Sequence, residues 1–305
     1  MTPIQRPLTD CIVNLSISEN EESDRRGFPI WQVNRVTLQL VSALFGQGAS
    51  VAFGHDWRED GVMEAVYGFA RQVQPPVPLS PVDAEAISQP LLRNLLPWPQ
   101  TPSLSPLEQE QLSATLRIEA AGLPETLHAF EAVARRAGPD DGLFIYARAR
   151  GLTFLRHKLG EMCHARLCVG GRRVGYQGRY PGIIEEALLA VRENRPLYLA
   201  GFLGGAAEQV VSAIEGRPIP DDFCRDSPLI GLYLDPPVKE VDFEDDRTID
   251  RQAIWKEFSD VGLEKLATAN ALTVEENEEL FHTPVVDRVI ELVLIGLSRV
   301  RAAAN

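Results

Sequence analysis

Residues 178–186, which read GRYPGIIEE, combine the side chains that bind or cleave a phosphorylated sugar. Backbone N–H groups at a helix N-terminus attract anions, and Gly182 stands where a predicted helix begins. Arg179 adds a guanidinium suited to phosphate, which makes it our first choice as the phosphate ligand. The carboxylates of Glu185 and Glu186 could hold ribose hydroxyls or assist cleavage of a glycosidic bond. The alternative is that acidic residues there only complement the helix dipole, which explains one of the two.

A second group of polar residues follows a short apolar strand, at residues 54–61 (GHDWREDG). Gly54 allows a ligand to approach the backbone closely. His55, Asp56 and Arg58 offer a base, an acceptor for ribose hydroxyls and a phosphate clamp. An ordinary solvated turn would also contain such residues.

The remaining candidates lie after three other predicted strands and on one helix. Ser16 and Ser18 follow the first strand, where small hydroxyl residues can contact phosphate or merely form a turn. Arg156 is a helical arginine that could hold phosphate or form a surface salt bridge. The glycines that end two later strands could admit a phosphate or form plain tight turns, and none fits the spacing G-x-G-x-x-G. They are Gly170, Gly171, Gly201, Gly204 and Gly205.

The elements that must position these residues alternate between strand and helix. Short apolar runs predict strands at 11–17, 50–53, 166–169 and 196–200. Helical spacing predicts helices at 31–45, 59–73, 107–121, 125–137, 152–163, 183–192 and 206–215. This alternation predicts an α/β fold, Rossmann-like and doubly wound, with a mainly parallel sheet and helices on both faces. In such sheets ligands bind at the carboxyl ends of the strands, where the strand order reverses.

Two further stretches bound the domain organisation. Nine of the 22 prolines lie in 74–106, which predicts an insertion outside the core, with an interdomain linker as the alternative. Residues 216–247 are rich in Asp and Pro and are expected to be irregular, whereas 250–301 have apolar helical faces. We therefore expect a nucleotide-binding core at 8–216, and at 217–305 an irregular connection and a helical C-terminal extension of the same fold.

Composition excludes several function classes. The 305 residues carry a net charge of −13, which disfavours nucleic-acid binding. No apolar run is long enough to span a membrane, and no signal peptide is evident, so we expect a cytoplasmic protein. The four cysteines lack the spacing of a zinc site, so we expect no metal. We also expect that no cofactor is required.

Taken together, these motifs resemble the SLOG superfamily, which includes the LOG cytokinin-activating enzymes and the DNA-processing protein DprA. The similarity is greatest to prokaryotic SLOG branches associated with TIR and sirtuin domains. The matching segments are 16–18 (SIS), 53–58 (FGHDWR), 178–190 (GRYPGIIEEALLA), 196–207 (PLYLAGFLGGAA) and 270–283 (NALTVEENEELFHT).

The resemblance implies two functions, and the acidic composition and helical C-terminal segment suggest a third; we rank all three. The first is sensing of a nucleotide-derived ligand, such as ADP-ribose, cyclic ADP-ribose or NAD, in a conflict or signalling system. The second is LOG-like hydrolysis of a nucleoside monophosphate, with Glu186 and Arg156 as the catalytic pair, or deoxyribosyl transfer. The third is a non-catalytic assembly subunit. Because the chain contains no TIR or sirtuin segment, any effector is expected to be a separate protein, and related folds suggest a homo-oligomer.

Overall fold

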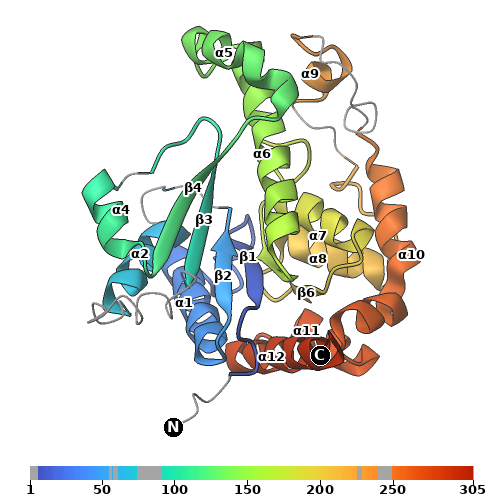
Figure 1. Ribbon diagram of the computed structural model, residues 1–305. Helices are drawn as coiled ribbons and strands as arrows, with labels where there is room; N and C mark the ends of the chain where they lie inside the picture. Colours follow the sequence, from blue (N-terminus) through green and yellow to red (C-terminus); the bar gives the residue numbers. More distant parts are fainter. Residues whose placement is uncertain are drawn as a thin grey trace.

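The computed structural model describes residues 6–54, 57, 61–73, 91–102, 104–224, 229–238 and 249–304. Six parallel strands form one sheet in the order β4-β3-β2-β1-β5-β6 (Figure 1). The strands are β1 Ile12–Ser18, β2 Ser50–Phe53, β3 Leu92–Pro97, β4 Leu116–Gly122, β5 Ala165–Gly170 and β6 Leu197–Ala200. This arrangement confirms the predicted Rossmann-like α/β fold.

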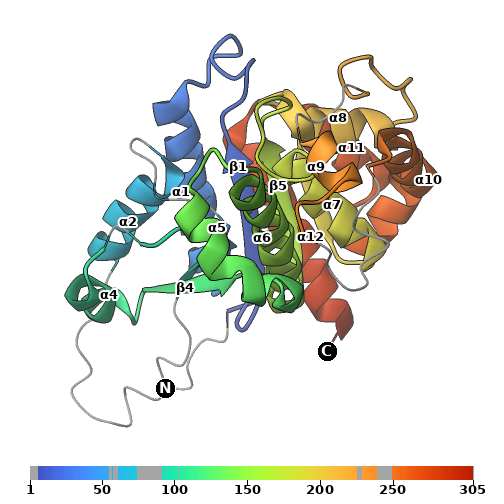
Figure 2. The ribbon, with the colours of Figure 1, turned by 90° about the horizontal axis from the view of Figure 1, so that it is seen from above.

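Helices cover both faces of the sheet. The helices are α1 Ile30–Gly46, α2 Val62–Gln72, α4 Pro106–Leu112, η1 Glu125–Phe130, α5 Glu131–Ala137, α6 Gly142–Met162, α7 Gly182–Arg192, α8 Gly205–Ile214, α9 Ile230–Leu234, α10 Arg251–Asn270, α11 Val274–His282 and α12 Val286–Ala304. One face packs against α1, α2 and α12, and the other against α6, α7 and α8. Figure 2 shows α1 and α2 on the opposite side of the sheet from α7 and α8. Within the described ranges, no helix is both long and apolar enough to cross a membrane.

The strand order reverses between β1 and β5. The chain builds β2, β3 and β4 on one side of β1 and then crosses over to add β5 and β6 on the other side. The register pairs Asn14 with Arg166, and Ser18 with Gly170. The carboxyl ends of β1 and β5 therefore meet at the position where open parallel sheets bind ligands.

Side-chain alternation gives these two central strands one apolar and one polar face. Val13, Leu15 and Ile17 of β1 point into the apolar core beneath α1 and α12. Because successive side chains of a strand point to opposite faces, Asn14 and Ser16 point toward α6 and α7. Arg166 of β5 faces the same way, so three polar side chains share the face that lies under these two helices.

Two sequence predictions are wrong in the half of the sheet that contains β3 and β4. The predicted insertion at 74–106 contains β3, which is a buried strand of the core. Residues 74–90 lie outside the described residues. The only proline within β3 is Pro97, the last residue of the strand, where a missing N–H disturbs the hydrogen-bond ladder least. The predicted helix at 107–121 is instead α4 followed by the edge strand β4.

The C-terminal segment is helical, as predicted, and is fastened to β6 by neutral side chains. Asn270 donates to the Leu197 carbonyl oxygen at 2.9 Å and to Asn277 Oδ1 at 2.8 Å. The Tyr198 hydroxyl donates to the Asn270 carbonyl oxygen at 2.9 Å. Thr273 caps α11 through a capping box with Glu276. Much of the sequence motif at 270–283 thus has a structural role.

Candidate functional site

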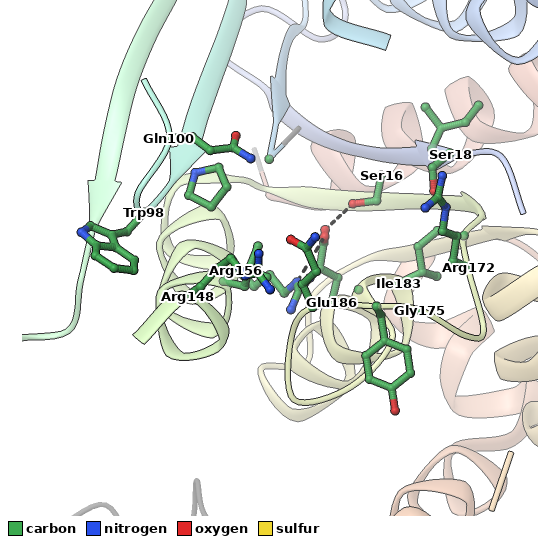
Figure 3. A pocket seen from close by; sticks show the side chains of 18 residues that line it. Ser16, Ser18, Trp98, Gln100, Arg148, Arg156, Arg172, Gly175, Ile183 and Glu186 are labelled. Atoms are coloured by element: carbon green, nitrogen blue, oxygen red, sulfur yellow. Dashed lines mark hydrogen bonds and ion pairs between the residues drawn. The ribbon is translucent and has the colours of Figure 1, made fainter. Parts of the chain in front are cut away.

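A pocket of about 350 Å³ opens at the carboxyl ends of the central strands, between the sheet and helices α6 and α7. Figure 3 shows Ser16 and Ser18 of β1 on one side, Arg148 and Arg156 of α6 on another, and Glu186 of α7 between them. The remaining lining comes from β1, from helices α6 and α7, and from the chain at or after the ends of β2, β3 and β5. These residues are Ile17, Gly54, Pro97, Trp98, Gln100, Leu152, Gly171, Arg172, Gly175, Tyr176, Gln177, Gly182 and Ile183.

Glu186 is fixed at the floor of this pocket. Its Oε2 accepts hydrogen bonds from the Ser16 hydroxyl and, at 3.1 Å, from the Arg166 guanidinium. Arg166 is almost fully buried and also donates to Asn14 Oδ1 at 3.2 Å and to the Arg156 carbonyl oxygen at 2.7 Å. A buried charge requires such pairing, so the polar face of β1 and β5 holds the carboxylate in one orientation.

Arg156 forms the second buried ion pair of the site. Its guanidinium donates to Glu185 Oε2, and Thr153 donates to the other Glu185 oxygen at 2.6 Å. Its Nε lies 3.9 Å from Glu186 Oε1. A Cβ atom at Gly182 would approach the Arg156 guanidinium to 2.9 Å, and one at Gly178 to 2.8 Å. These glycines therefore make room for the arginine at the start of α7.

A second pocket of about 360 Å³ lies on the far side of Glu185, between α6, α7 and α10. Its lining includes Thr153, Arg179, Tyr180 and Glu185. The Arg179 guanidinium stacks on the Tyr180 ring at 5.1 Å from its centroid. Glu185 and Glu186 face different pockets because neighbouring residues of an α-helix point about 100° apart.

The structure brings seven of the predicted site residues together in the first pocket. They are Ser16, Ser18, Gly54, Arg156, Gly171, Gly182 and Glu186. Arg179 and Glu185 line the second pocket instead. His55, Asp56 and Arg58 lie outside the described residues.

The other predicted glycines form tight packing contacts. A Cβ at Gly170, which has a φ of 68°, would lie 2.4 Å from the Ser18 carbonyl oxygen. Gly201 donates its N–H to the Phe281 carbonyl oxygen at 3.0 Å and so joins β6 to α11. Gly204 packs against the side chains of Glu22 and Arg26, and Gly205 against the Gly171 carbonyl oxygen. These turns shape the walls around the site without lining the first pocket.

Several residues of the site were not predicted from the sequence. Trp98 and Gln100 follow β3, which was predicted to lie outside the core. Arg148 lies in the first half of α6, before the predicted start of that helix. Arg166 carried a usable signal, because an arginine within a buried strand (RLCV) needs a buried partner.

Among the described residues, the titratable side chains give no sign of a metal centre. In the described parts of the chain, no group of three or more His, Cys, Asp or Glu side chains is placed to hold a metal ion. All four cysteines are free, and only Cys224 is exposed. Burial raises the pKa of the Cys163 thiol to about 12 and that of the Cys11 thiol to about 11. Neither thiol is therefore suited to act as a nucleophile at neutral pH.

Comparison with known proteins assigns the family. A search of curated proteins finds no match, but the family model described as SLOG cluster2 matches residues 7–280. This span includes all six strands and every residue that lines the first pocket. It links the site to the binding or processing of a nucleotide-type ligand. The chain belongs to the SLOG family, in the group described as SLOG cluster2.

Proposed function

We propose that this chain senses a nucleotide-derived ligand, of the ADP-ribose, cyclic ADP-ribose or NAD type, in a prokaryotic defence or signalling system. The observation that carries the proposal is the pocket of about 350 Å³ at the β1–β5 reversal, with the Glu186 carboxylate held at its floor. This is the position at which doubly wound sheets bind nucleotides. Family membership supports the same ligand class.

The floor of the pocket suits a ribose. Glu186 Oε2 is already engaged by Ser16 and Arg166, whereas Oε1 lies 3.9 Å from the Arg156 guanidinium, beyond hydrogen-bond distance. Oε1 can therefore accept from a sugar hydroxyl. Ser18 and the backbone of Gly171 border the same space.

Hydrolysis of an N-glycosidic bond is the second candidate, because the same Glu186 oxygen could stabilise a developing positive charge on the ribose. In that mechanism Arg156 would hold the phosphate of a nucleoside monophosphate. The ion pair with Glu185 opposes this role, because it already engages the guanidinium. We therefore place binding before hydrolysis.

One experiment tests both candidates. Small molecules released by heat from the purified protein are identified by mass spectrometry, and ADP-ribose, cyclic ADP-ribose, NAD and AMP are screened by thermal shift. A sensor is expected to show a raised Tm and to return the nucleotide intact. Recovery of free base and ribose phosphate, lost in Glu186→Gln, would favour hydrolysis.

The matched control for this experiment is Glu278→Gln, which removes one carboxylate from the exposed face of α11. We expect Glu278→Gln to bind as the wild type does and Glu186→Gln to lose most of the thermal shift. If none of the four nucleotides raises the Tm of the wild-type protein, the sensing proposal is wrong.

We also propose that the chain forms a homo-oligomer and acts on a separate effector protein. The family resemblance supports this part of the proposal. Light scattering with and without ADP-ribose tests the assembly, and a single-chain mass in both states would contradict it.

A further inference from the structure

The arginines around the first pocket differ in how their charges are balanced. Arg156 pairs with Glu185, and Arg166, behind the floor, pairs with Glu186. Arg172, at the mouth, pairs with Glu19 at 2.6 Å. Each of these three guanidiniums thus has a carboxylate of its own.

Arg148 lines the same pocket and has no such partner in the part of the chain that the structure describes. Among the residues that the structure describes, no carboxylate forms an ion pair with it, and its Nε is buried and lacks a hydrogen-bond partner. Burial lowers the pKa of the Arg148 guanidinium below its usual value, as expected for a cation without a compensating anion. A partly buried, unpaired cation costs free energy, and an anionic ligand would remove that cost.

The position of Arg148 indicates which part of a ligand it can reach. Arg148, Leu152 and Arg156 all line the pocket along one face of α6. The eight residues from Arg148 to Arg156 correspond to about 12 Å along the helix axis. Figure 1 shows that α6 extends past the carboxyl ends of β1 and β2. Arg148 is about two turns closer to the start of this helix than Arg156, so it lies further beyond those strand ends. There it stands near Trp98, on the side of the pocket opposite Ser18 (Figure 3).

We propose that Arg148 binds the outer phosphate of a diphosphate-linked nucleotide whose ribose lies at Ser16 and Glu186. This inference rests on the proposed nucleotide-binding function. In a monophosphate, the phosphate is joined to the ribose C5′ by one oxygen and stays near the floor. A second phosphate extends toward the outer part of the pocket, where the planar guanidinium can donate to two of its oxygens.

Calorimetric titration of the full chain with ADP-ribose and with AMP tests this assignment. We expect Arg148→Met to bind ADP-ribose about 10- to 100-fold more weakly than the wild type, because charge-assisted hydrogen bonds to the phosphate are lost. The affinity for AMP, which lacks the second phosphate, should change about threefold or less. Arg148→Lys keeps the positive charge but loses the planar guanidinium that can donate to two oxygens. Its affinity for ADP-ribose should therefore lie between those of Arg148→Met and the wild type.

Two controls separate binding from folding. Arg136→Met removes an arginine from the exposed surface of α5 and should bind both ligands as the wild type does. Without ligand, Arg148→Met should melt no lower than the wild type, and about 2 °C higher if the unpaired cation is as costly as its burial indicates. A purely structural arginine would give a lower Tm and an equal loss for both nucleotides.

The results distinguish failure of this inference from failure of the proposed function. If the wild type binds ADP-ribose and Arg148→Met binds it equally well, the role of Arg148 is wrong and the sensing proposal stands. Equal losses for ADP-ribose and AMP would also overturn the role. If the wild type binds neither of these nucleotides, nor cyclic ADP-ribose or NAD, both proposals fail.

Discussion

Two buried polar clusters lie on opposite faces of the sheet, and they differ in charge and in access. We call Asn14, Ser16, Thr153, Arg156, Arg166, Glu185 and Glu186 the charged cluster. We call Tyr198, Asn270 and Asn277 the neutral cluster. Ser16, Arg156 and Glu186 of the charged cluster line the first pocket, whereas the neutral cluster is enclosed between β6 and the C-terminal helices.

Both clusters are extensively hydrogen-bonded, so pairing does not distinguish them. In the neutral cluster, the amides of Asn270 and Asn277 bond to each other and to backbone groups, and α12 packs so closely that a Cβ at Gly296 would lie 2.5 Å from the Tyr198 ring. Amides and a phenol can do this without the desolvation cost of charges.

Buried ion pairs seldom add stability beyond what apolar side chains of similar size would supply. The charged cluster is therefore poorly explained by folding alone, and its contact with a pocket gives it a functional reason. We therefore expect the neutral cluster to hold the fold together, and under the proposed function the charged cluster presents Glu186 to a ligand.

The largest expected effect comes from breaking the charged cluster at Arg166. Arg166→Met leaves Glu186 buried without its main counter-charge and should lower the free energy of unfolding by about 3–5 kcal/mol. Denaturant unfolding followed by circular dichroism measures the change. The double variant Arg166→Met/Glu186→Met removes both charges and should recover most of this loss. A double variant as unstable as the single one would show that the cluster stabilises the fold in its own right, against the comparison.

A smaller effect is expected in the neutral cluster. Asn270→Ala removes an amide that bonds to Leu197, Leu272 and Asn277, and it should cost about 2–4 kcal/mol in the same unfolding assay. Because Asn270 does not line the pocket, ADP-ribose affinity measured below the melting temperature should equal that of the wild type. A matching loss of affinity would mean that the two clusters are coupled through β6.

The location of the charged cluster could be inferred from sequence because it depends on strand direction and alternation. Carboxyl ends of parallel strands share one edge, so Ser16, Gly171 and the start of α7 had to lie close together. The regular strand–helix alternation around β1, β5 and β6 predicts that these strands are parallel, with their carboxyl ends at the same edge of the sheet.

Other parts of the site could not be inferred, for identifiable physical reasons. β3 was not predicted because it is a short strand within a proline-rich stretch. The strand itself contains proline only at its last residue, Pro97. Residues 107–121 contain good helix formers, and their period-2 segment at Leu116 and Ile118 is too brief to outweigh them. Whether Arg179 faces the first or the second pocket depends on the path of one loop, which spacing does not determine.

A matched pair of hydroxyl deletions should have still smaller effects. Ser16→Ala removes one hydrogen bond to Glu186, and Tyr198→Phe removes one to the Asn270 carbonyl oxygen. Each should cost about 1 kcal/mol of stability. Only Ser16→Ala should weaken ADP-ribose binding, by about 3- to 10-fold, because Glu186 loses one of its anchors at the pocket floor. Equal binding by the two variants would contradict the division between a functional and a structural cluster.

The buried cysteines allow each cluster to be monitored without altering it. Cys163 and Cys168 lie near Arg166 and Glu186, and Cys11 lies close enough to Tyr198 to influence its pKa. Burial raises the pKa of Cys163 to about 12, so at pH 8 only about one thiol in ten thousand is the reactive thiolate. The pKa of Cys11, about 11, leaves about one thiol in a thousand as thiolate at the same pH.

In the native wild type, a maleimide at pH 8 should therefore modify exposed Cys224 first, with the three buried thiols reacting only as the fold opens. Mass spectrometry of the digested protein identifies the modified residues over time. Arg166→Met should accelerate labelling of Cys163 and Cys168 before that of Cys11, and Asn270→Ala should reverse the order. The same order in both variants would indicate that the two faces of the sheet open as one unit, because local opening at either cluster would expose its own thiols first.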